Sequence, residues 1–392
     1  MKKLKEVRLG VIGCGSMAQA HMAYFKEVDR LKFVAAADQF GDTLEKVVKE
    51  HSVEGFDNGS KLIKSGLVDA VLIATPHFFH PTFALEAFKH GVHVLVEKPV
   101  AVTAYDAEQV NKAYAKVKNK LLYAAMFNQR TRPGWAKVKQ LIDEGAIGEI
   151  VRTNWIITDW FRTQSYYNSG GWRATWAGEG GGVLLNQCPH NLDLFQWFCG
   201  MPCRVTANVG LGKYHNIEVE DDVTAILEYP NGATGVFVTT TADSPGTNRL
   251  EITGDRGSIV ADASDTITYL QNHTPVSVYR ATAEQRFGHV GVDTYKITPT
   301  GSMTQHKNIT VNFINALTKG EKLIAPATEG INGLELGNAM LMSGLLKKPV
   351  DIPTPRKKFA DMLKKLAKES TYRKPEAQKP KASANDLGGS WK

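Results

Sequence analysis

Lys98 follows a short apolar run, Val94-Leu95-Val96, within the stretch Glu97-Lys98-Pro99. Consecutive aliphatic residues are typical of a buried parallel strand, and a proline cannot continue the hydrogen-bond ladder of that strand. Open α/β sheets bind ligands at the carboxyl ends of their strands, which is where this lysine would lie. Lys98 is therefore a candidate catalytic residue. The alternative is that Glu97 and Lys98 are ordinary surface charges at a strand end.

His190 is the second candidate catalytic residue, because it follows an unusual glycine-rich segment that begins at Gly178 and includes Gly180-Gly181-Gly182. Pro189, directly before it, predicts that a helix starts here. Asn186 lies four residues before His190, so the two side chains would share one face if this turn is helical. The helix dipole would then lower the pKa of the imidazole and favour the neutral form that acts as a base. A buried histidine bonded to backbone groups is the alternative.

A dinucleotide-binding turn is predicted by Gly13-Cys14-Gly15-Ser16-Met17-Ala18, which follows an apolar strand and precedes a helical pattern to about Val28. Gly13 permits the tight turn, Gly15 lets the backbone approach a pyrophosphate, and Ala18 lets the helix pack closely on the strand. Ser16 and Met17 belong to the helix start, whose unpaired N–H groups would face the phosphates. A tight turn that binds no ligand is the alternative.

Asp38 follows the next predicted strand, Lys32 to Ala37, at the spacing that a ribose-binding acid requires. Its carboxylate can accept hydrogen bonds from both ribose hydroxyls and would repel a 2′-phosphate. The next residues, Gln39 and Phe40, include no arginine that could receive such a phosphate. We therefore expect Asp38 and Gln39 to contact the cofactor, and we favour NAD over NADP.

The composition argues against nucleic acid and membrane partners. The net charge is +7, but from Lys347 onward thirteen Lys and Arg stand against five Asp and Glu, which leaves 34 basic and 35 acidic residues in the rest of the chain. A nearly neutral body gives no reason to expect nucleic acid, and no apolar run is long enough to span a bilayer.

The four cysteines indicate free thiols rather than disulfides or a metal site. Cys14, Cys188, Cys199 and Cys203 are irregularly spaced, which is typical of a reducing compartment, and we expect the cytoplasm. The last three could be combined with His190 into a zinc set. Because Cys199 and Cys203 lack the two-residue spacing of a zinc knuckle, we expect no metal.

Two regions of different texture follow one another along the chain. Apolar strands alternate with helices up to about residue 127, which predicts a Rossmann domain with a doubly wound parallel sheet over residues 1–127. Longer β-type runs with hairpin turns predict an α+β domain over residues 128–353, built on a large, mostly antiparallel open sheet. Its last helical runs, at 306–318 and 329–346, could pack back on the first domain.

Residues 354–392 predict a basic amphipathic helix followed by a tail. Thr354 is a candidate cap, Pro355 suits the first turn, and one face is apolar, formed by Phe359, Met362, Leu363 and Leu366. Docking on its own body or on a neighbouring subunit is favoured over binding of an anionic membrane or nucleic acid. Residues 375–390 have the composition of a disordered segment.

Several motifs, taken in order, resemble the Gfo/Idh/MocA oxidoreductases over about residues 6–353. They are the G-x-G-x-x-A turn, Ala74-Thr75-Pro76 with His80, Glu97-Lys98-Pro99, Phe127-Asn128-Gln129-Arg130, the stretch from Glu144 to Ile150, and the glycine-rich segment that ends in His190 and Asp193. The resemblance implies a Rossmann domain, a bound nicotinamide dinucleotide, and a sugar-like or cyclitol substrate between the two domains. It also implies a homo-oligomer, a dimer or tetramer, formed through the C-terminal sheet.

The resemblance also implies roles for individual residues. Lys98 would bind the reacting hydroxyl next to a cis Lys98–Pro99 peptide, and His190 would be the general base. The cofactor would contact Thr75, Pro76, His80, Glu97, Lys98, Asn128, Trp172 and Arg173, and Arg173 would also border the substrate. Two residues depart from the family pattern, because Asn186 stands where the family usually has aspartate and His77 where it often has asparagine.

The leading hypothesis is therefore an NAD-dependent oxidoreductase that interconverts a secondary ring hydroxyl and a ketone on a pyranose, a glycoside (preferably at C3) or a cyclitol. Asn186 would hold another ring hydroxyl or His190 itself. Aromatic residues suited to stacking on a sugar face, or alternatively to packing in the core, are Trp160, Tyr166, Tyr167, Trp172 and Trp176. The other hypotheses are a glycosidase that oxidises its substrate transiently with bound NAD, and a non-catalytic sensor of dinucleotide and sugar.

Overall fold

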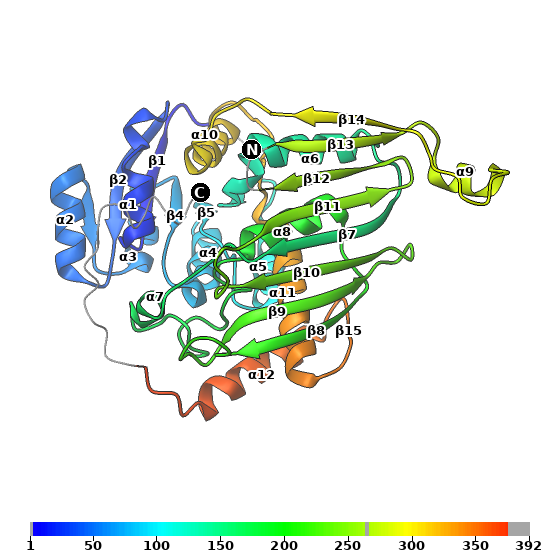
Figure 1. Ribbon diagram of the computed structural model, residues 1–392. Coiled ribbons are helices and arrows are strands. Elements are labelled where there is room, and N and C mark those ends of the chain that lie inside the picture. The colour runs from blue at the N-terminus through cyan, green and yellow to red at the C-terminus, as the bar shows by residue number, and fades with distance from the viewer. Residues whose placement is uncertain (1–2, 263–265, 375–392) are drawn as a thin grey trace.

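The computed structural model describes residues 3–262 and 266–374. Its first part is a six-stranded parallel sheet in the order β3-β2-β1-β4-β5-β6 (Figure 1). The strands are β1 (Val7–Ile12), β2 (Leu31–Ala37), β3 (Glu54–Phe56), β4 (Ala70–Ile73), β5 (His93–Val96) and β6 (Tyr123–Ala125). Since β4, β5 and β1 are almost wholly buried, their continuous Val, Leu and Ile runs are those of central parallel strands.

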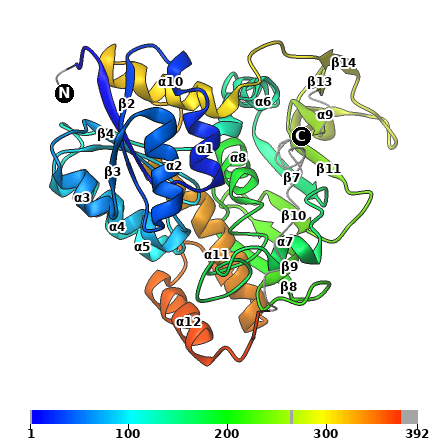
Figure 2. The same cartoon turned by 90° about the vertical axis from the view of Figure 1, so that its left-hand side faces the viewer.

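Helices connect these strands and flank the sheet (Figure 2). They are α1 (Ser16–Met22), α2 (Gly41–His51), α3 (Gly59–Lys64), α4 (His80–Lys89) and α5 (Ala104–Ala115). Thr103 caps α5, because its hydroxyl accepts a hydrogen bond from the backbone N–H of Asp106 at 3.1 Å. The helix expected to reach Val28 is shorter than predicted, since α1 ends at Met22 and a 3₁₀ turn occupies Phe25–Glu27.

The second part is a nine-stranded sheet in the order β14-β13-β12-β11-β7-β10-β9-β8-β15 (Figure 1). Only the β7–β10 pair is parallel. The strands are β7 (Ile150–Ile157), β8 (Arg204–Leu211), β9 (Glu220–Glu228), β10 (Thr234–Thr240), β11 (Asn248–Gly254), β12 (Gly257–Asp262), β13 (Ile267–Asn272), β14 (Val292–Ile297) and β15 (Val350–Asp351). The predicted fold class, a parallel sheet followed by a mostly antiparallel open sheet, is confirmed.

One face of the second sheet carries helices. Phe195 of α8 (Pro189–Cys199) contacts Trp155 of β7 and Phe237 of β10 edge to face or tilted, at 5.9 and 5.7 Å between ring centroids. The other helices of this region are α6 (Pro133–Asp143), α7 (Gln164–Asn168), α9 (Val276–Thr282), α10 (Gln305–Thr318), α11 (Gly330–Leu346) and α12 (Arg356–Glu369). The short elements β3, α3, α7, α9, β13, β14 and β15 were not predicted, because few of their residues show an apolar period.

Helix α11 lies between the two sheets (Figure 2). Asn338 accepts a hydrogen bond from the N–H of Ala104 at 2.8 Å, and Ser343 accepts one from the N–H of Ala207 at 2.9 Å. Helix α11 therefore contacts both α5 of the first part and β8 of the second.

Helix α12 docks on the body of its own chain. Phe359 and Leu363 are buried, and Arg356 forms ion pairs with Glu335 and Glu108. The prediction that Thr354 caps this helix is wrong, because its hydroxyl donates to Glu335 at 2.5 Å and Pro355 occupies the cap position. No helix among the described residues is long and apolar enough to cross a membrane, and the segment expected to be disordered, 375–390, lies outside the described residues.

Candidate active site

Lys98 lies just beyond the carboxyl end of β5 and reaches toward the glycine-rich segment. Its Nζ donates a hydrogen bond to the backbone carbonyl of Asn186 at 2.9 Å, and the Lys98–Pro99 peptide is cis, as predicted. Burial lowers the pKa of Lys98, and the nearby guanidinium of Arg173 lowers it further, whereas the carboxylates of Glu97 and Glu179 oppose this change. The structure thus places this lysine at a partly buried site between the two sheets.

His190 is the second residue of α8, close to Lys98. Its side chain is buried, and neither ring nitrogen has a hydrogen-bond partner among the described residues. Its pKa is lowered well below 6.5, first by burial and then by the charges of Lys98 and His306. The predicted direction is correct, and burial and the neighbouring charges are its main causes. A neutral imidazole with two unused nitrogens can accept a proton from a substrate.

Asn186 does not share a helical face with His190, so this expectation is wrong. The helix begins only at Pro189, and Asn186 lies in the preceding turn, where its N–H donates to the carbonyl of Gly182 at 2.9 Å. Its side-chain Nδ2 donates to the carboxylate of Glu179. The contact between Asn186 and Lys98 therefore runs through the backbone carbonyl of Asn186, while its side chain is held from behind by an acid.

Glu97 pairs with a residue that the sequence did not single out. Its Oε1 lies 2.6 Å from Nε2 of His21, whose Nδ1 lies 2.5 Å from the hydroxyl of Tyr24. Burial would raise the pKa of Glu97, but His21, His306 and Lys98 together lower it to about 2. His21 precedes Glu97 by 76 residues, and no motif links them. The carboxylate of Glu97 is therefore held by His21, on the side of the site that the parallel sheet forms.

The turn at the start of α1 has the geometry of a phosphate cradle. Gly13 has φ +90°, and an added Cβ would lie 2.6 Å from the carbonyl oxygen of Ala74, whereas an added Cβ at Gly15 would meet nothing within 4 Å. Asp38, at the end of β2, accepts hydrogen bonds from the N–H groups of Cys14 at 2.7 Å and Phe40 at 2.8 Å. The acid and the glycine turn are thus adjacent, and Gly15 faces open space.

Two buried polar atoms beyond the ends of β4 and β6 fit a bound dinucleotide. Thr75 Oγ1 and Asn128 Oδ1 are buried and have no partner among the described residues. His80 instead binds backbone carbonyls, those of Pro99 at 2.7 Å and Thr75 at 2.8 Å. His80 thereby ties the strand end that carries Lys98 to the Thr75-Pro76 turn. These features, with Gly13, Gly15 and Asp38, fit the cofactor that the sequence predicts.

The aromatic residues divide into core and site. Tyr167 and Trp176 are buried, which is consistent with the alternative of packing in the core. Arg173 donates to the Tyr166 hydroxyl at 2.8 Å and lies over the rings of Tyr166 and Trp172, at 4.7 and 4.8 Å from their centroids. Trp160, partly buried, donates to Asn191 on α8 at 3.2 Å. Trp172 also packs edge to face on His77, the residue that departs from the family pattern.

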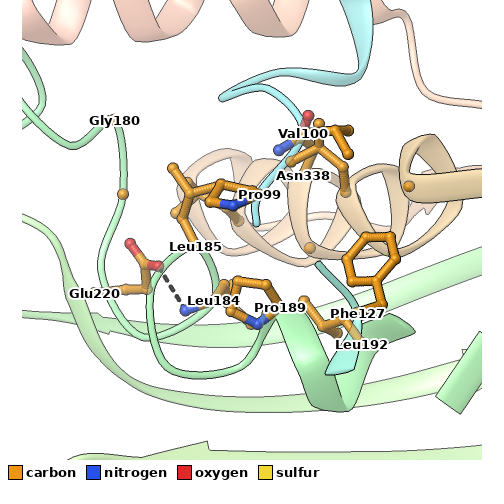
Figure 3. Close-up of a pocket in the computed structure, with 16 residues that line it drawn as sticks. Pro99, Val100, Phe127, Gly180, Leu184, Leu185, Pro189, Leu192, Glu220 and Asn338 are labelled. Carbon is orange, nitrogen blue, oxygen red and sulfur yellow. Dashed lines mark hydrogen bonds between the residues drawn. The ribbon is translucent and has the colours of Figure 1, made fainter. Parts of the chain in front are cut away.

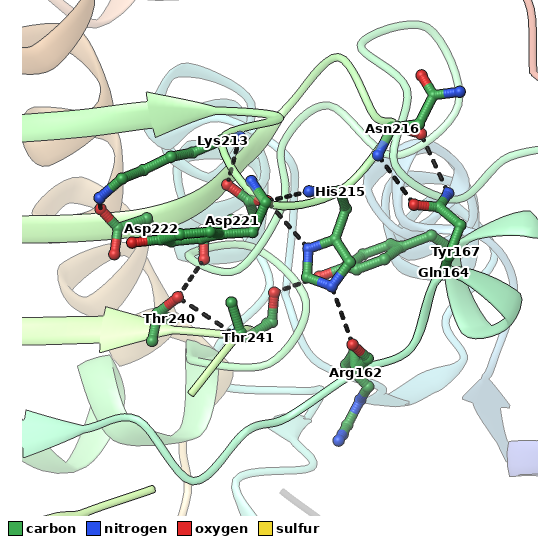
Figure 4. Close-up of polar contacts among 12 residues, drawn as sticks. Arg162, Gln164, Tyr167, Lys213, His215, Asn216, Asp221, Asp222, Thr240 and Thr241 are labelled. Carbon is green, nitrogen blue, oxygen red and sulfur yellow. Dashed lines mark hydrogen bonds and ion pairs between the residues drawn. The ribbon is translucent and has the colours of Figure 1, made fainter. Parts of the chain in front are cut away.

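A polar network fixes the loop that carries Tyr166. His215 donates from Nδ1 to Asp221 and from Nε2 to the carbonyl of Arg162, both at 2.9 Å, and its ring lies 4.8 Å from that of Tyr167 (Figure 4). Asp221 is fully buried at the start of β9, so the loop is anchored to the open sheet.

The end of the described chain also reaches this site. Lys374 Nζ donates to the backbone carbonyl of Arg173 at 3.0 Å and to that of Gly170, and Tyr372 donates to the carbonyl of Asn216 at 2.8 Å. Residues 370–374 therefore lie against the loop that carries Trp172 and Arg173. No pattern in the sequence predicts this contact.

A buried ion pair holds α8 in place. Arg130 donates from Nε and Nη2 to the two oxygens of Asp193, at 2.8 and 2.7 Å, and from Nη1 to Glu329 at 2.6 Å. Arg130 and Asp193 come from two of the motifs that the family resemblance was based on. The structure gives them a positioning role, because Asp193 lies one turn beyond His190 on the same helix.

The two halves of the chain match known sequence profiles. The profile described as "Oxidoreductase family, NAD-binding Rossmann fold" matches residues 7–125, and the profile of the "GFO/IDH/MocA C-terminal domain" matches residues 135–260. A levoglucosan dehydrogenase of Pseudarthrobacter phenanthrenivorans is 28% identical over 66% of this chain and 74% of that protein. An inositol 2-dehydrogenase of Rhizobium meliloti is 24% identical over 88% of this chain and 99% of that protein.

Among solved structures, the WlbA dehydrogenase of Bordetella pertussis, in complex with NADH and UDP-GlcNAcA, has a TM-score of 0.74 at 25% identity. The match covers 89% of this chain and 99% of that one. Because the two profiles together span the parallel sheet and most of the open sheet, the chain belongs to the GFO/IDH/MocA oxidoreductases, and its first part is an NAD-binding Rossmann fold.

Proposed function

We propose that this oxidoreductase interconverts a secondary hydroxyl and a ketone on the ring of a pyranose, a glycoside or a cyclitol, with oxidation at C3 of a glycoside as the preferred reaction. The observation that carries the proposal is the pair formed by His190 and Lys98. His190 is a buried imidazole without a partner among the described residues, and Lys98 is close enough to lower its pKa. The similarity to a levoglucosan dehydrogenase and an inositol 2-dehydrogenase supports a ring alcohol as the substrate class.

In the oxidation direction, His190 takes the proton of the substrate hydroxyl. The ammonium group of Lys98 stabilises the alkoxide that forms, which is worth most in a partly buried site. Bound NAD supplies the hydride acceptor through its nicotinamide ring. Asn186 binds a neighbouring ring hydroxyl or the imidazole of His190. The substrate site is lined by Trp160, Tyr166 and Arg173, which exclude water from it.

We further propose that residues 1–127 form the domain that holds the cofactor and residues 128–353 the domain that completes the substrate site. The segment from residue 354 onward belongs to neither domain. Copies of the chain would pair into a dimer or tetramer through the open face of the nine-stranded sheet. In support of this, Ile156 and Ile226 on its strands are 39% and 54% exposed. Exposed apolar side chains on a sheet face are typical of an interaction surface.

The test begins with native mass spectrometry of the purified protein, which detects NAD(H) that is already bound. Pyranoses, methyl glycosides, levoglucosan and inositols are then added, and nicotinamide absorbance is followed. We expect His190→Ala and Lys98→Ala to lower kcat/KM by about 100-fold or more. The controls are His289→Ala and Lys120→Ala, both at exposed positions, and they should leave it unchanged.

Three outcomes would contradict the proposal. Full turnover by both His190→Ala and Lys98→Ala would refute the mechanism. Release of free sugar without net NADH would indicate a glycosidase instead of a dehydrogenase. Binding of NAD(H) with neither signal from any compound would indicate a non-catalytic sensor.

A further inference from the structure

Glu179 is a buried acid with a specific set of partners. Its side chain is 2% exposed, Oε2 accepts a hydrogen bond from the N–H of Ala174 at 2.6 Å, and Oε1 accepts one from the side chain of Asn186. Burying a carboxylate is unfavourable unless hydrogen bonds and opposite charges offset the loss of water. Glu179 is therefore placed to act on Asn186 and on the charges near it.

The contact with Glu179 fixes which end of the Asn186 amide faces the substrate. An ionised carboxylate only accepts hydrogen bonds, so the NH₂ group of Asn186 must point toward Glu179. The amide oxygen, Oδ1, then points to the opposite side as an acceptor. If Glu179 were protonated, it could donate to Oδ1, and the amide could turn over and present a donor instead.

Glu179 also balances the charge of Lys98. The two groups are close enough that Glu179 raises the pKa of Lys98 and Lys98 lowers that of Glu179. Asn186 connects them, because its side chain binds Glu179 and its backbone carbonyl binds Lys98. An aspartate at position 186 would supply a carboxylate. In this chain Glu179 supplies it instead, and the Asn186 amide lies between the two positions.

We propose that Glu179 is a positioning residue that holds the Asn186 amide with its oxygen toward the substrate and supplies the negative charge opposite Lys98. This inference rests on the proposed function, in which Lys98 and His190 carry out the reaction. It assigns the role of the missing aspartate to two residues, an amide that contacts the substrate or His190 and a carboxylate behind it.

Glu220 supports the same segment from the other side. Its Oε1 accepts hydrogen bonds from the N–H groups of Gly182 and Leu184, at 2.8 and 3.1 Å, beside an apolar cavity of about 20 Å³ (Figure 3). Burial, together with the charge of Glu179, raises the pKa of Glu220 to about 7. The two carboxylates therefore interact, and each disfavours ionisation of the other.

The charged groups that face Glu179 decide its protonation. Burial raises the pKa of Glu179, and the cations Arg173 and Lys98 oppose this change. Lys374 also interacts with it electrostatically, as does Glu220. Because the proposed role requires the ionised form, activity should fall as the pH decreases through the pKa of Glu179.

The test compares Glu179→Gln, Asn186→Asp and the double variant, with Glu321→Gln at an exposed position as the control. Glu179→Gln removes the charge but keeps the shape, and we expect kcat/KM to fall about 10- to 100-fold. Asn186→Asp alone places two carboxylates side by side, which raises the pKa of the pair. In the pH profile of kcat/KM, the loss of activity at low pH should therefore move to higher pH. The double variant carries one carboxylate, at position 186, and should regain most of the activity.

A second measurement requires no substrate. Competitive acetylation with acetic anhydride, read by mass spectrometry, gives the pKa of Lys98, which should fall in Glu179→Gln and return in the double variant. The proposal is overturned if Glu179→Gln keeps the wild-type pH profile and Lys98 pKa, or if the double variant recovers neither. Should the wild type turn over no compound of the panel, the proposed function fails, while the Lys98 pKa still tests Glu179.

Discussion

Asp193→Asn tests whether a buried ion pair holds the helix that carries His190. Asp193 and Arg130 are at most 2% exposed and share two hydrogen bonds. Asparagine keeps the shape but turns one acceptor oxygen into an NH₂ group that faces the guanidinium. Removing one partner of a buried pair costs about 3–5 kcal/mol. Because Glu329 still accepts from Arg130 at 2.6 Å, we expect the lower end, about 3 kcal/mol.

The assay is urea unfolding followed by circular dichroism, with Asp351→Asn as the matched control. Asp351 pairs with Arg204 at 2.7 Å, but these side chains are 71% and 48% exposed, so the same substitution should leave the free energy of unfolding almost unchanged. Replacing both Arg130 and Asp193 with apolar residues of similar size should restore stability to within about 1 kcal/mol. Equal losses in Asp193→Asn and Asp351→Asn would refute the reasoning.

Three further predictions concern the cofactor, the pH dependence and the end of the chain. Gly13→Ala should prevent folding or NADH binding, since its Cβ would clash with backbone, whereas Gly15→Ala should fold normally, as thermal unfolding will report, and bind NADH more weakly in a fluorescence titration. In a pH profile of kcat/KM, activity should fall at low pH as Glu179 and His190 become protonated, the latter well below 6.5. At high pH the loss should begin below 10.5, because Lys98 loses its proton there. Lys374→Ala should raise KM more than it lowers kcat in steady-state assays, because the Trp172–Arg173 loop loses an anchor.

Local patterns in the sequence were sufficient to predict the fold class, and they singled out Lys98 and His190, which the structure brings close together. The strand that ends in Glu97-Lys98-Pro99 and the turn at Gly13 combine side-chain type with a backbone requirement, and such signals depend only on neighbouring residues. The same reasoning failed for β13 and β14 at the sheet edge. Strand β14 is exposed along almost its whole length, so it has no apolar alternation to detect.

The groups that balance the charges of the site could not be predicted, because folding brings them together from distant parts of the chain. His21 binds Glu97 across 76 residues, and Glu220 binds the N–H of Gly182 across 38. Glu179 lies only seven residues before Asn186, yet no regular element has a period that joins them. The helical spacing of Asn186 and His190 even led to a wrong prediction, that of a shared helical face, because the helix starts three residues after Asn186. When a motif lacks a residue such as aspartate, a neighbour in space can therefore supply its charge. In this chain we infer that the neighbour is Glu179, which binds Asn186.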